Sequence, residues 1–284
     1  MKKDHTAKRS WRVLALALCL AMLVGLLPTV ALAVDTTIDT PTTLENGSEF
    51  NISGTATLNA PITVSGGVAR ITGGGTLRRG SSLTGAMITV NSGATLILDN
   101  VTVDGAEIRG YEYRGVYVYG KLIMGQRAVL KNHVNTYGYG SALYVADYGK
   151  VEMNGGTVSD FANAGVYVQN GYGTFTMNGG EIYRNTSTGI SNVGTTTVNN
   201  GRIHDNGDNG ILSSTSLTIG SGASGTEICN NGSNGVYSSG TLTMTGGYVH
   251  SNGASGIGNF GTGAISGGDI RHNKGNSNVA NGGT

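Results

Sequence analysis

The chain has little of what usually stabilises a small exported protein. It holds two cysteines, three prolines and one tryptophan, and only 12% of its 284 residues are charged. Cys19 and Trp11 lie in the N-terminal leader described next, so Cys229 is the single cysteine after it and an internal disulfide framework is excluded. No basic stripe of the kind that binds nucleic acid is present. Stability must therefore come from packing of the chain on itself.

Residues 1–33 have the pattern of a secretory signal peptide. A basic region with five Lys and Arg residues precedes the apolar run Val13–Leu27, and Ala31-Leu32-Ala33 supplies an A-x-A cleavage site. An uncleaved membrane anchor is the alternative interpretation. The long basic region is typical of Gram-positive bacterial signals. We expect a secreted, extracellular or cell-surface protein with no membrane insertion after cleavage, and the remaining chain is mildly acidic, with 13 basic and 16 acidic residues.

Glycine is abundant, at 49 residues, and much of it is periodic. Asparagines recur at intervals of 21, 25, 21 and 21 residues, each except the last followed four residues later by a glycine. These asparagines are Asn185, Asn206, Asn231, Asn252 and Asn273. A fixed period near 21 residues is typical of a solenoid.

Apolar residues alternate within each unit, which predicts three short strands separated by Gly and Asn corners. One unit buries almost nothing alone, so the units must stack and pair in parallel. The predicted fold is all-β: a single-stranded parallel β-helix of about ten coils. Its right hand is expected from the chirality of β-crossovers. We expect this domain over 34–273, with 34–50 as an N-terminal cap or partial coil and 274–284 as a polar C-terminal tail.

Two polar columns are expected from the period. The repeated asparagines suit corners, because Asn tolerates positive φ and its side chain bonds to local backbone. Positions Asn192, Ser213, Ser238 and Asn259 are expected to form a small internal polar ladder, where earlier coils have valine. Both columns are interpreted as structural.

The longer coils between Gly93 and Gly149 can be aligned on the regular units to locate their extra residues. Aligning Ile182 with Val103 and Val129, and Ile190 with Val116 and Leu143, places the extra residues at one corner. The insertions are 106–114 and 132–141, and on adjacent coils they should lie one above the other.

Ten of the 13 tyrosines fall between residues 111 and 172. Tyr117, Tyr144 and Tyr167 are expected to form an exposed aromatic ladder beside loops carrying Tyr111, Tyr113, Tyr137 and Tyr139. Insertions on one face of a repeat protein often form its binding face, and tyrosine suits stacking on sugars or a protein partner. The alternative interpretation is that tyrosine is simply a good exposed strand residue.

The segments GTFTMNGGEIYRN, GTLTMTGGYVHSN and SGATLILDNVTVDG resemble the right-handed β-helix repeats of bacterial secreted and surface proteins, which share the pectate-lyase-like architecture. The resemblance implies the fold, whereas function depends on individual sites. Enzymes of that superfamily cleave acidic polysaccharides with clustered Asp, or with Ca²⁺ and an Arg or Lys base. Their Asp-Asp, Gly-His-Gly and Arg-Ile-Lys signatures are missing here. If the protein is an enzyme, we expect the site where Lys131, His133, Arg109 and Glu112 converge, and Ca²⁺ only for a lyase.

Two further sets of outward-facing positions suggest possible binding sites. Tyr183, His204, Cys229, His250 and Arg271 should stack, and His-Cys-His is a metal-binding combination. No second thiolate or carboxylate completes it, and an insertion at 222–225 threatens its register, so we predict no metal and no cofactor. Thr-x-Thr pairs resemble the arrays of ice-binding proteins, although threonine is also a common strand residue.

The favoured hypothesis is a rigid, adhesin-like binding module that presents a tyrosine-rich patch to a polysaccharide, a surface glycan or a protein. The alternative is a polysaccharide lyase or glycoside hydrolase. Ice binding is a remote third possibility.

Overall fold

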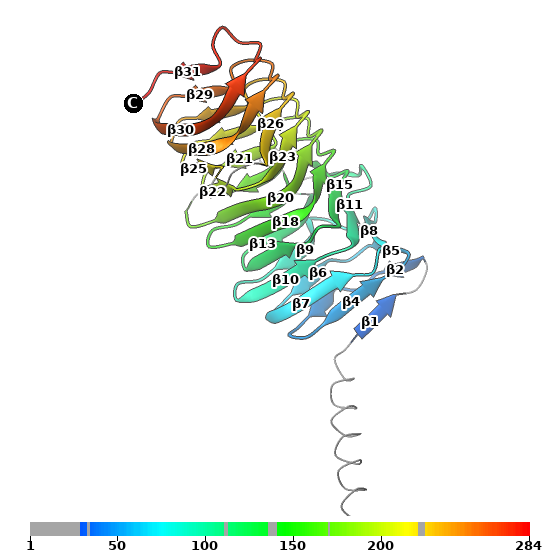
Figure 1. The fold of residues 1–284 in the computed structure, drawn as a ribbon. Helices are drawn as coiled ribbons and strands as arrows, with labels where there is room; N and C mark the ends of the chain where they lie inside the picture. Colours follow the sequence, from blue (N-terminus) through cyan, green and yellow to red (C-terminus); the bar gives the residue numbers. More distant parts are fainter. Residues whose placement is uncertain (1–28, 33–34, 111–112, 136–140, 170, 221–224) are drawn as a thin grey trace, which may run out of the picture.

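The protein is a parallel β-solenoid of about ten coils. The computed structural model describes residues 29–32, 35–110, 113–135, 141–169, 171–220 and 225–284, and every regular element among them is a strand. Successive coils stack along one axis from β1 to β31 (Figure 1). Each coil adds one rung to each of three parallel ladders, as the 21-residue period predicts.

The first ladder begins each coil. It consists of β1 (Thr29–Leu32), β4 (Glu49–Ile52), β7 (Gly67–Thr72), β10 (Ala94–Leu98), β14 (Lys121–Met124), β18 (Lys150–Ser159), β20 (Thr174–Tyr183), β22 (Thr195–Val198), β25 (Ser216–Ile219), β28 (Thr241–His250) and β30 (Thr262–Arg271). The ten-residue strands β18, β20, β28 and β30 pass through a corner and join the second ladder as well.

The second ladder follows across that corner. It consists of β2 (Thr36–Ile38), β5 (Thr55–Leu58), β8 (Thr76–Arg79), β11 (Val101–Asp104), β15 (Ala128–Lys131), β23 (Gly201–His204), β26 (Thr226–Cys229) and the second halves of the long strands.

The third ladder closes each coil. It consists of β3 (Thr42–Leu44), β6 (Ile62–Val64), β9 (Ala86–Val90), β13 (Arg114–Val118), β17 (Ser141–Val145), β19 (Ala164–Val168), β21 (Ile190–Asn192), β24 (Ile211–Ser213), β27 (Val236–Ser238), β29 (Ile257–Asn259) and β31 (Val279–Asn281).

The two long coils carry their extra residues at the corner before the third ladder. There the short strands β12 (Arg109–Gly110) and β16 (Val134–Asn135) pair in parallel with each other. This pairing confirms that the insertions lie one above the other. Part of each insertion, 111–112 and 136–140, falls outside the described residues.

The core is a stack of apolar columns, and one of them corrects the predicted alignment. Val103 pairs with Leu130, Leu130 pairs with Val158, and Val158 pairs with Ile182. Aligning Val129 with Ile182 is therefore wrong by one residue, and because successive strand residues face opposite sides, Leu130 is the buried one. The predicted match of Ile190 to Val116 and Leu143 is confirmed.

The repeated asparagines form a buried hydrogen-bonded ladder. The Nδ2 of Asn185 donates to the Oδ1 of Asn206 at 2.9 Å. The same bond joins each asparagine to the next one: Asn206 to Asn231 at 2.9 Å, Asn231 to Asn252 at 3.0 Å, and Asn252 to Asn273 at 2.9 Å. Each Oδ1 also accepts the backbone N–H of the preceding asparagine. The structural interpretation of this column is confirmed.

Positive φ falls on the residue before each asparagine, not on the asparagine itself. Arg184, Asp205, Asn230, Ser251 and His272 have φ between 51° and 57°. The corner thus divides the two tasks that were expected of one residue: one position bends the backbone, and the next supplies the amide. The position four residues after Asn206 requires glycine, because a Cβ at Gly210 would lie 2.6 Å from the carbonyl oxygen of Gly235.

The internal polar ladder of the third strands is also confirmed. Val118, Val145 and Val168 pair in register with Asn192, Ser213, Ser238 and Asn259, and all are buried. Asn192 Nδ2 donates to Ser213 Oγ at 2.9 Å.

The ends of the described chain add rungs. β1 lies inside the expected signal peptide yet pairs with β4, so cleavage after residue 33 would leave β4 at the edge of the first ladder. β2 and β3 place 36–44 in the second and third ladders. In the expected polar tail, β31 pairs with β29, and Asn259 Nδ2 donates to Asn281 Oδ1 at 2.9 Å.

Replacing Asn206 with alanine is expected to lower the free energy of unfolding by about 2–4 kcal/mol. The change leaves two donors of Asn185 and the carbonyl of Ile182 without their partner inside the stack. Urea denaturation followed by circular dichroism measures the loss.

Asn178→Ala is the matched control for that experiment. Asn178 is exposed and donates to Asn154 Oδ1 at 2.9 Å, so its loss should change stability by less than about 0.5 kcal/mol. Equal losses for the two variants would contradict a special role for the buried ladder.

Candidate functional site: an aromatic corner

Tyr117, Tyr144 and Tyr167 stack on the outer face of the third ladder, as predicted. Their ring centroids are 4.7 Å and 5.1 Å apart, with interplanar angles of 12° and 28°. The expected exposure of this tyrosine ladder is wrong for Tyr144, which is only 9% exposed, while Tyr117 and Tyr167 are half-buried. The ladder is therefore mainly a packed support for its surroundings.

Arg114 and Tyr119 cover this ladder. The Arg114 guanidinium carbon lies 4.9 Å from the Tyr117 ring centroid and 4.4 Å from that of Tyr144, within cation–π range. Burial, and then a hydrogen bond with Tyr119, raise the pKa of Tyr117 far above its ordinary value. The phenol of Tyr117 is consequently neutral at physiological pH.

The exposed aromatic rings lie at the next corner, between the third ladder and the first. Tyr119, Tyr148 and Tyr172 occupy this position in three consecutive coils and are 44%, 63% and 68% exposed. The Tyr148 and Tyr172 rings stack at 4.8 Å. The Asp147 carboxylate accepts the backbone N–H of Tyr172 at 2.8 Å and so fixes the loop that carries it. We call Tyr119, Tyr148 and Tyr172 the aromatic corner.

These three residues were not selected from the sequence, although a signal exists. Each directly precedes a glycine that marks the end of a coil: Gly120, Gly149 and Gly173. A Tyr-Gly pair repeated at one corner predicts stacked rings there. The predicted binding face lies instead at the corner of the insertions 106–114 and 132–141.

A hollow of about 310 Å³ adjoins the aromatic corner on its first-ladder side. It is lined by Ser92, Gly93, Ala94, Thr95, Tyr119, Gly120, Lys121, Tyr148 and Lys150. Lys121 and Lys150 are direct partners on neighbouring strands, an arrangement that is destabilising for like charges. Lys121 forms a 2.7 Å ion pair with Glu152, whereas Lys150 has no ion pair among the described residues. The hollow thus combines two aromatic rings with excess positive charge.

A second groove, of about 330 Å³, begins where the tyrosine ladder ends. Tyr167, Ser191 and Leu212 are consecutive members of one outer column and form its floor, and Asn163, Ser187 and Asp208 line its side. It offers one ring face and several hydroxyl and amide groups.

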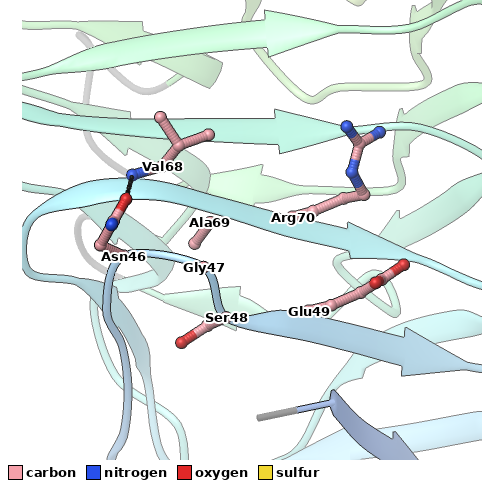
Figure 2. A pocket seen from close by; sticks show the side chains of 7 residues that line it. All are labelled: Asn46, Gly47, Ser48, Glu49, Val68, Ala69 and Arg70. Atoms are coloured by element: carbon pink, nitrogen blue, oxygen red, sulfur yellow. Dashed lines mark hydrogen bonds between the residues drawn. The ribbon is translucent and has the colours of Figure 1, made fainter. Parts of the chain in front are cut away.

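Figure 2 shows a third hollow, at the N-terminal coils. It is lined by Asn46, Gly47, Ser48, Glu49, Val68, Ala69 and Arg70. Asn46 Oδ1 accepts the Val68 N–H at 3.0 Å, and Glu49 and Arg70 are register neighbours of opposite charge. Without an aromatic ring or a net charge, it has less to offer a ligand than the aromatic corner.

The remaining predicted tyrosines divide into two groups. The ring of Tyr113 packs against the guanidinium of Arg79, 4.4 Å from its centroid. Arg79 is 2% exposed and donates to the carbonyls of Leu83, Gly85 and Arg114 at 2.8–2.9 Å, so Tyr113 belongs to a structural cluster. Tyr111, Tyr137 and Tyr139, like Glu112, lie outside the described residues.

The residues proposed for catalysis do not share one surface. Lys131 lies on the outer face, 4.0 Å from Asp104, and Arg109 is exposed at the insertion. His133 is 1% exposed and points inward, with Nε2 3.2 Å from the carbonyl oxygen of Val103. Burial and the charge of Arg79 lower the pKa of His133 to about 3, so its imidazole is neutral at physiological pH.

The Thr-x-Thr columns are in register but short. Thr174, Thr195, Ser216, Thr241 and Thr262 align, as do Thr176, Thr197, Thr218 and Thr243. In the preceding coil the two columns become Lys150 and Glu152, and Ala264 ends the second one. The described array therefore spans four to five rungs.

Among the residues that the structure describes, none forms a helix with the length and apolar character needed to cross a membrane.

The chain matches no protein-family model, and no curated protein has a matching sequence. Among solved structures it is similar to crystal structures of mutants of the periplasmic alginate epimerase AlgG. A threonine-to-asparagine mutant has 13% identity and a TM-score of 0.43, and a double mutant has 12% identity and a TM-score of 0.40. Each match covers 85% of this chain and 73% of the epimerase chain. The parallel β-helix architecture itself rests on the strand pairing described above.

His133 makes stability depend on pH. Because its folded pKa lies below the ordinary value near 6.5, the unfolded chain binds the extra proton and stability is lost as pH falls from about 6.5 towards 3. We expect His133→Phe to reduce the slope of unfolding free energy against pH by up to about 1.4 kcal/mol per pH unit in that window.

Urea titrations between pH 6.5 and 4.5 measure this slope. Asn178→Ala is the control, since it removes no ionisable group and should leave the slope unchanged. An unchanged slope in His133→Phe would show that His133 is accessible to protons in the folded state.

Proposed function

We propose that the protein is exported and binds a polysaccharide through the aromatic corner and the lysine-lined hollow beside it. The observation that carries the proposal is the Tyr148–Tyr172 stack, whose rings remain 63% and 68% exposed. A tyrosine ring has an apolar face and a polar tip, which matches the alternating character of a sugar ring. Rings on successive coils form a platform that can contact successive sugars of one chain.

The charge of the hollow supports an acidic polysaccharide. Lys121 and Lys150 are paired across neighbouring strands, and Glu152 neutralises only one of them. A carboxylate of the ligand beside Lys150 would offset the repulsion between the two ammonium groups. Binding of an acidic ligand would therefore lower the electrostatic repulsion between Lys121 and Lys150.

The support beneath the corner is rigid. Leu122, Val145 and Val151, on the strands that flank it, are at most 1% exposed, and the tyrosine ladder packs beside it. A surface that is already ordered loses little conformational entropy when it binds. This suits a binding module that presents its ligand site on a rod.

Export is proposed from the signal-peptide pattern of residues 1–33. An extracellular or cell-surface location would bring the aromatic corner into contact with polysaccharide. A surface glycan or a protein on another surface remains the alternative partner.

The runner-up is a polysaccharide lyase or glycoside hydrolase. It has weaker support, because His133 faces the interior and Lys131 lies beside Asp104. Product release from a polyuronide that is lost in Lys131→Ala but not in Tyr148→Ala would favour this enzyme over a binding module.

The double variant Tyr148→Ala/Tyr172→Ala is expected to bind polysaccharide at least about tenfold more weakly, equivalent to about 1.4 kcal/mol. Affinity electrophoresis in gels containing polygalacturonate, alginate or a neutral glucan measures this. Tyr248→Ala is the matched control, since Tyr248 is 45% exposed on another face, in β28. Equal retardation of both variants, or none for the unaltered protein on any polysaccharide, would refute the proposal.

Lys150→Ala separates an acidic ligand from a neutral one. We expect weaker binding to polyuronides, unchanged binding to neutral glucans and a smaller dependence of affinity on salt, because an exposed ion pair is screened. Lys274→Ala, which removes an exposed lysine near the C-terminal end of the solenoid, should have no effect. A parallel loss on neutral and acidic polymers would contradict the role of charge.

A further inference from the structure

The outer face of the second ladder brings together three donor atoms that the sequence did not connect. Tyr183, His204, Cys229, His250 and Arg271 form one column, so the insertion before β26 does not disturb its register, contrary to expectation. Glu227, two residues before Cys229 on the same strand, supplies the carboxylate that the column alone lacks. The carboxylate oxygen of Glu227, Sγ of Cys229 and a ring nitrogen of His250 all lie within 4.8 Å of one another.

We propose that Glu227, Cys229 and His250 form a binding site for a divalent transition-metal ion of the zinc class, held by one oxygen, one sulfur and one nitrogen. The site lies on β26 and β28 in the second ladder, on later coils than the aromatic corner, which lies between the third ladder and the first (Figure 1). It is independent of the proposed polysaccharide binding.

The distances suit tetrahedral coordination. Zinc bonds of about 2.0 Å to nitrogen and oxygen and about 2.3 Å to sulfur place tetrahedral ligand atoms roughly 3.3–3.5 Å apart. Here Glu227 Oε1 lies 3.5 Å from Cys229 Sγ and 2.9 Å from His250 Nε2. The third separation, between Sγ and the ring nitrogen of His250, lies within 4.8 Å, so an ion would enter once small side-chain movements bring the three atoms to these distances. The side chains of Glu227 and His250 are 34% and 29% exposed, which leaves a path from solvent.

Neighbouring groups hold the ligands in place. His250 Nδ1 lies 3.0 Å from Ser251 Oγ, so Nε2 is the nitrogen presented to the ion. The Arg202 Nε lies 2.8 Å from Glu227 Oε2, so Oε1 is the oxygen that faces Cys229 and His250. The Arg202 guanidinium also donates to Cys229 Sγ at 3.5 Å, a contact that an ion on the sulfur would displace. Such outer contacts to ligand side chains are typical of metal sites.

His204 is a second observation at the same place. It precedes Cys229 in the column and is 7% exposed, with Nδ1 2.6 Å from Asp205 Oδ2. Its Nε2 is buried without a hydrogen-bond partner in the described part of the chain. The nearest carboxylate oxygen, Glu181 Oε2, lies 4.0 Å from this nitrogen, beyond hydrogen-bond distance. A buried ring nitrogen without a hydrogen bond costs free energy, and a carboxylate on the other nitrogen is the usual arrangement of a metal-bound histidine. An ion on Cys229 would lie one rung from this nitrogen.

Metal binding at this site should release a proton. A cysteine binds a metal ion as the thiolate, so coordination by Cys229 must displace the proton of its thiol. Calorimetry with ZnCl₂ in two buffers of different ionisation enthalpy measures proton release at pH 7.5. We expect one ion per chain and weaker binding at pH 6, where protons compete more strongly.

Cobalt(II) titration of the whole exported chain, kept reduced, tests the ligands directly. We expect visible bands of tetrahedral cobalt and a near-ultraviolet thiolate-to-cobalt band, both reversed by excess zinc. Cys229→Ser should abolish the thiolate band, and His250→Ala and Glu227→Gln should each weaken zinc binding by at least about tenfold. His272→Ala, an exposed histidine outside the column, should bind as the unaltered protein does.

Three results would overturn the proposal: no stoichiometric cobalt or zinc binding, binding without a thiolate band, or equal binding by Cys229→Ser and the unaltered protein. Circular dichroism checks that each variant remains folded. Because Glu227→Gln keeps the size of the side chain, its loss of zinc binding in a folded chain separates coordination from structural damage.

Discussion

The structure depends on in-register parallel pairing, in which each side chain lies on its counterpart in the next coil. Each residue must be compatible with the residues about 4.8 Å above and below it. Apolar columns satisfy this by packing, and the asparagine column by donating from each Nδ2 to the next Oδ1. With one cysteine after residue 33 and few charges, repetition of these contacts along the stack replaces disulfides and ion pairs as the source of stability.

The same constraint made most of the fold predictable. Between Gly173 and Asn273 the period sets the register directly, and the asparagine and inner polar ladders follow from it. The insertions remove that information, because a coil of 27 or 29 residues can be aligned in more than one way. Choosing Val129 instead of Leu130 is a slip of one residue, which exchanges the two faces of a strand. The correct register places His133 next to Phe161 of the following coil, with ring centroids 6.2 Å apart, and both side chains are buried at the corner after the second ladder.

Side-chain exposure was less predictable than register. The Tyr117–Tyr144–Tyr167 stack followed from spacing, but its covering by Arg114 depends on how one long side chain lies across two coils. Likewise, Glu227 reaches His250 diagonally across neighbouring strands, a contact that no single column of the repeat contains. Columns follow from the period, whereas contacts between columns depend on rotamers. The Glu227–His250 contact is of this second kind, whereas the aromatic corner could have been predicted from the repeated Tyr-Gly pairs at one corner.

Departures from good stacking indicate where ligands would act. Most columns satisfy their own groups, so a ligand would add little to them. Lys121 and Lys150 repel each other across a rung, Tyr148 and Tyr172 leave most of their surface in water, and His204 Nε2 is buried without a hydrogen bond among the described residues. Each of these arrangements costs free energy, and each would be relieved by a particular chemistry: an anion, a sugar face or a metal ion. In a solenoid whose repeats enforce consistency, these exceptions are more informative about function than the repeat itself.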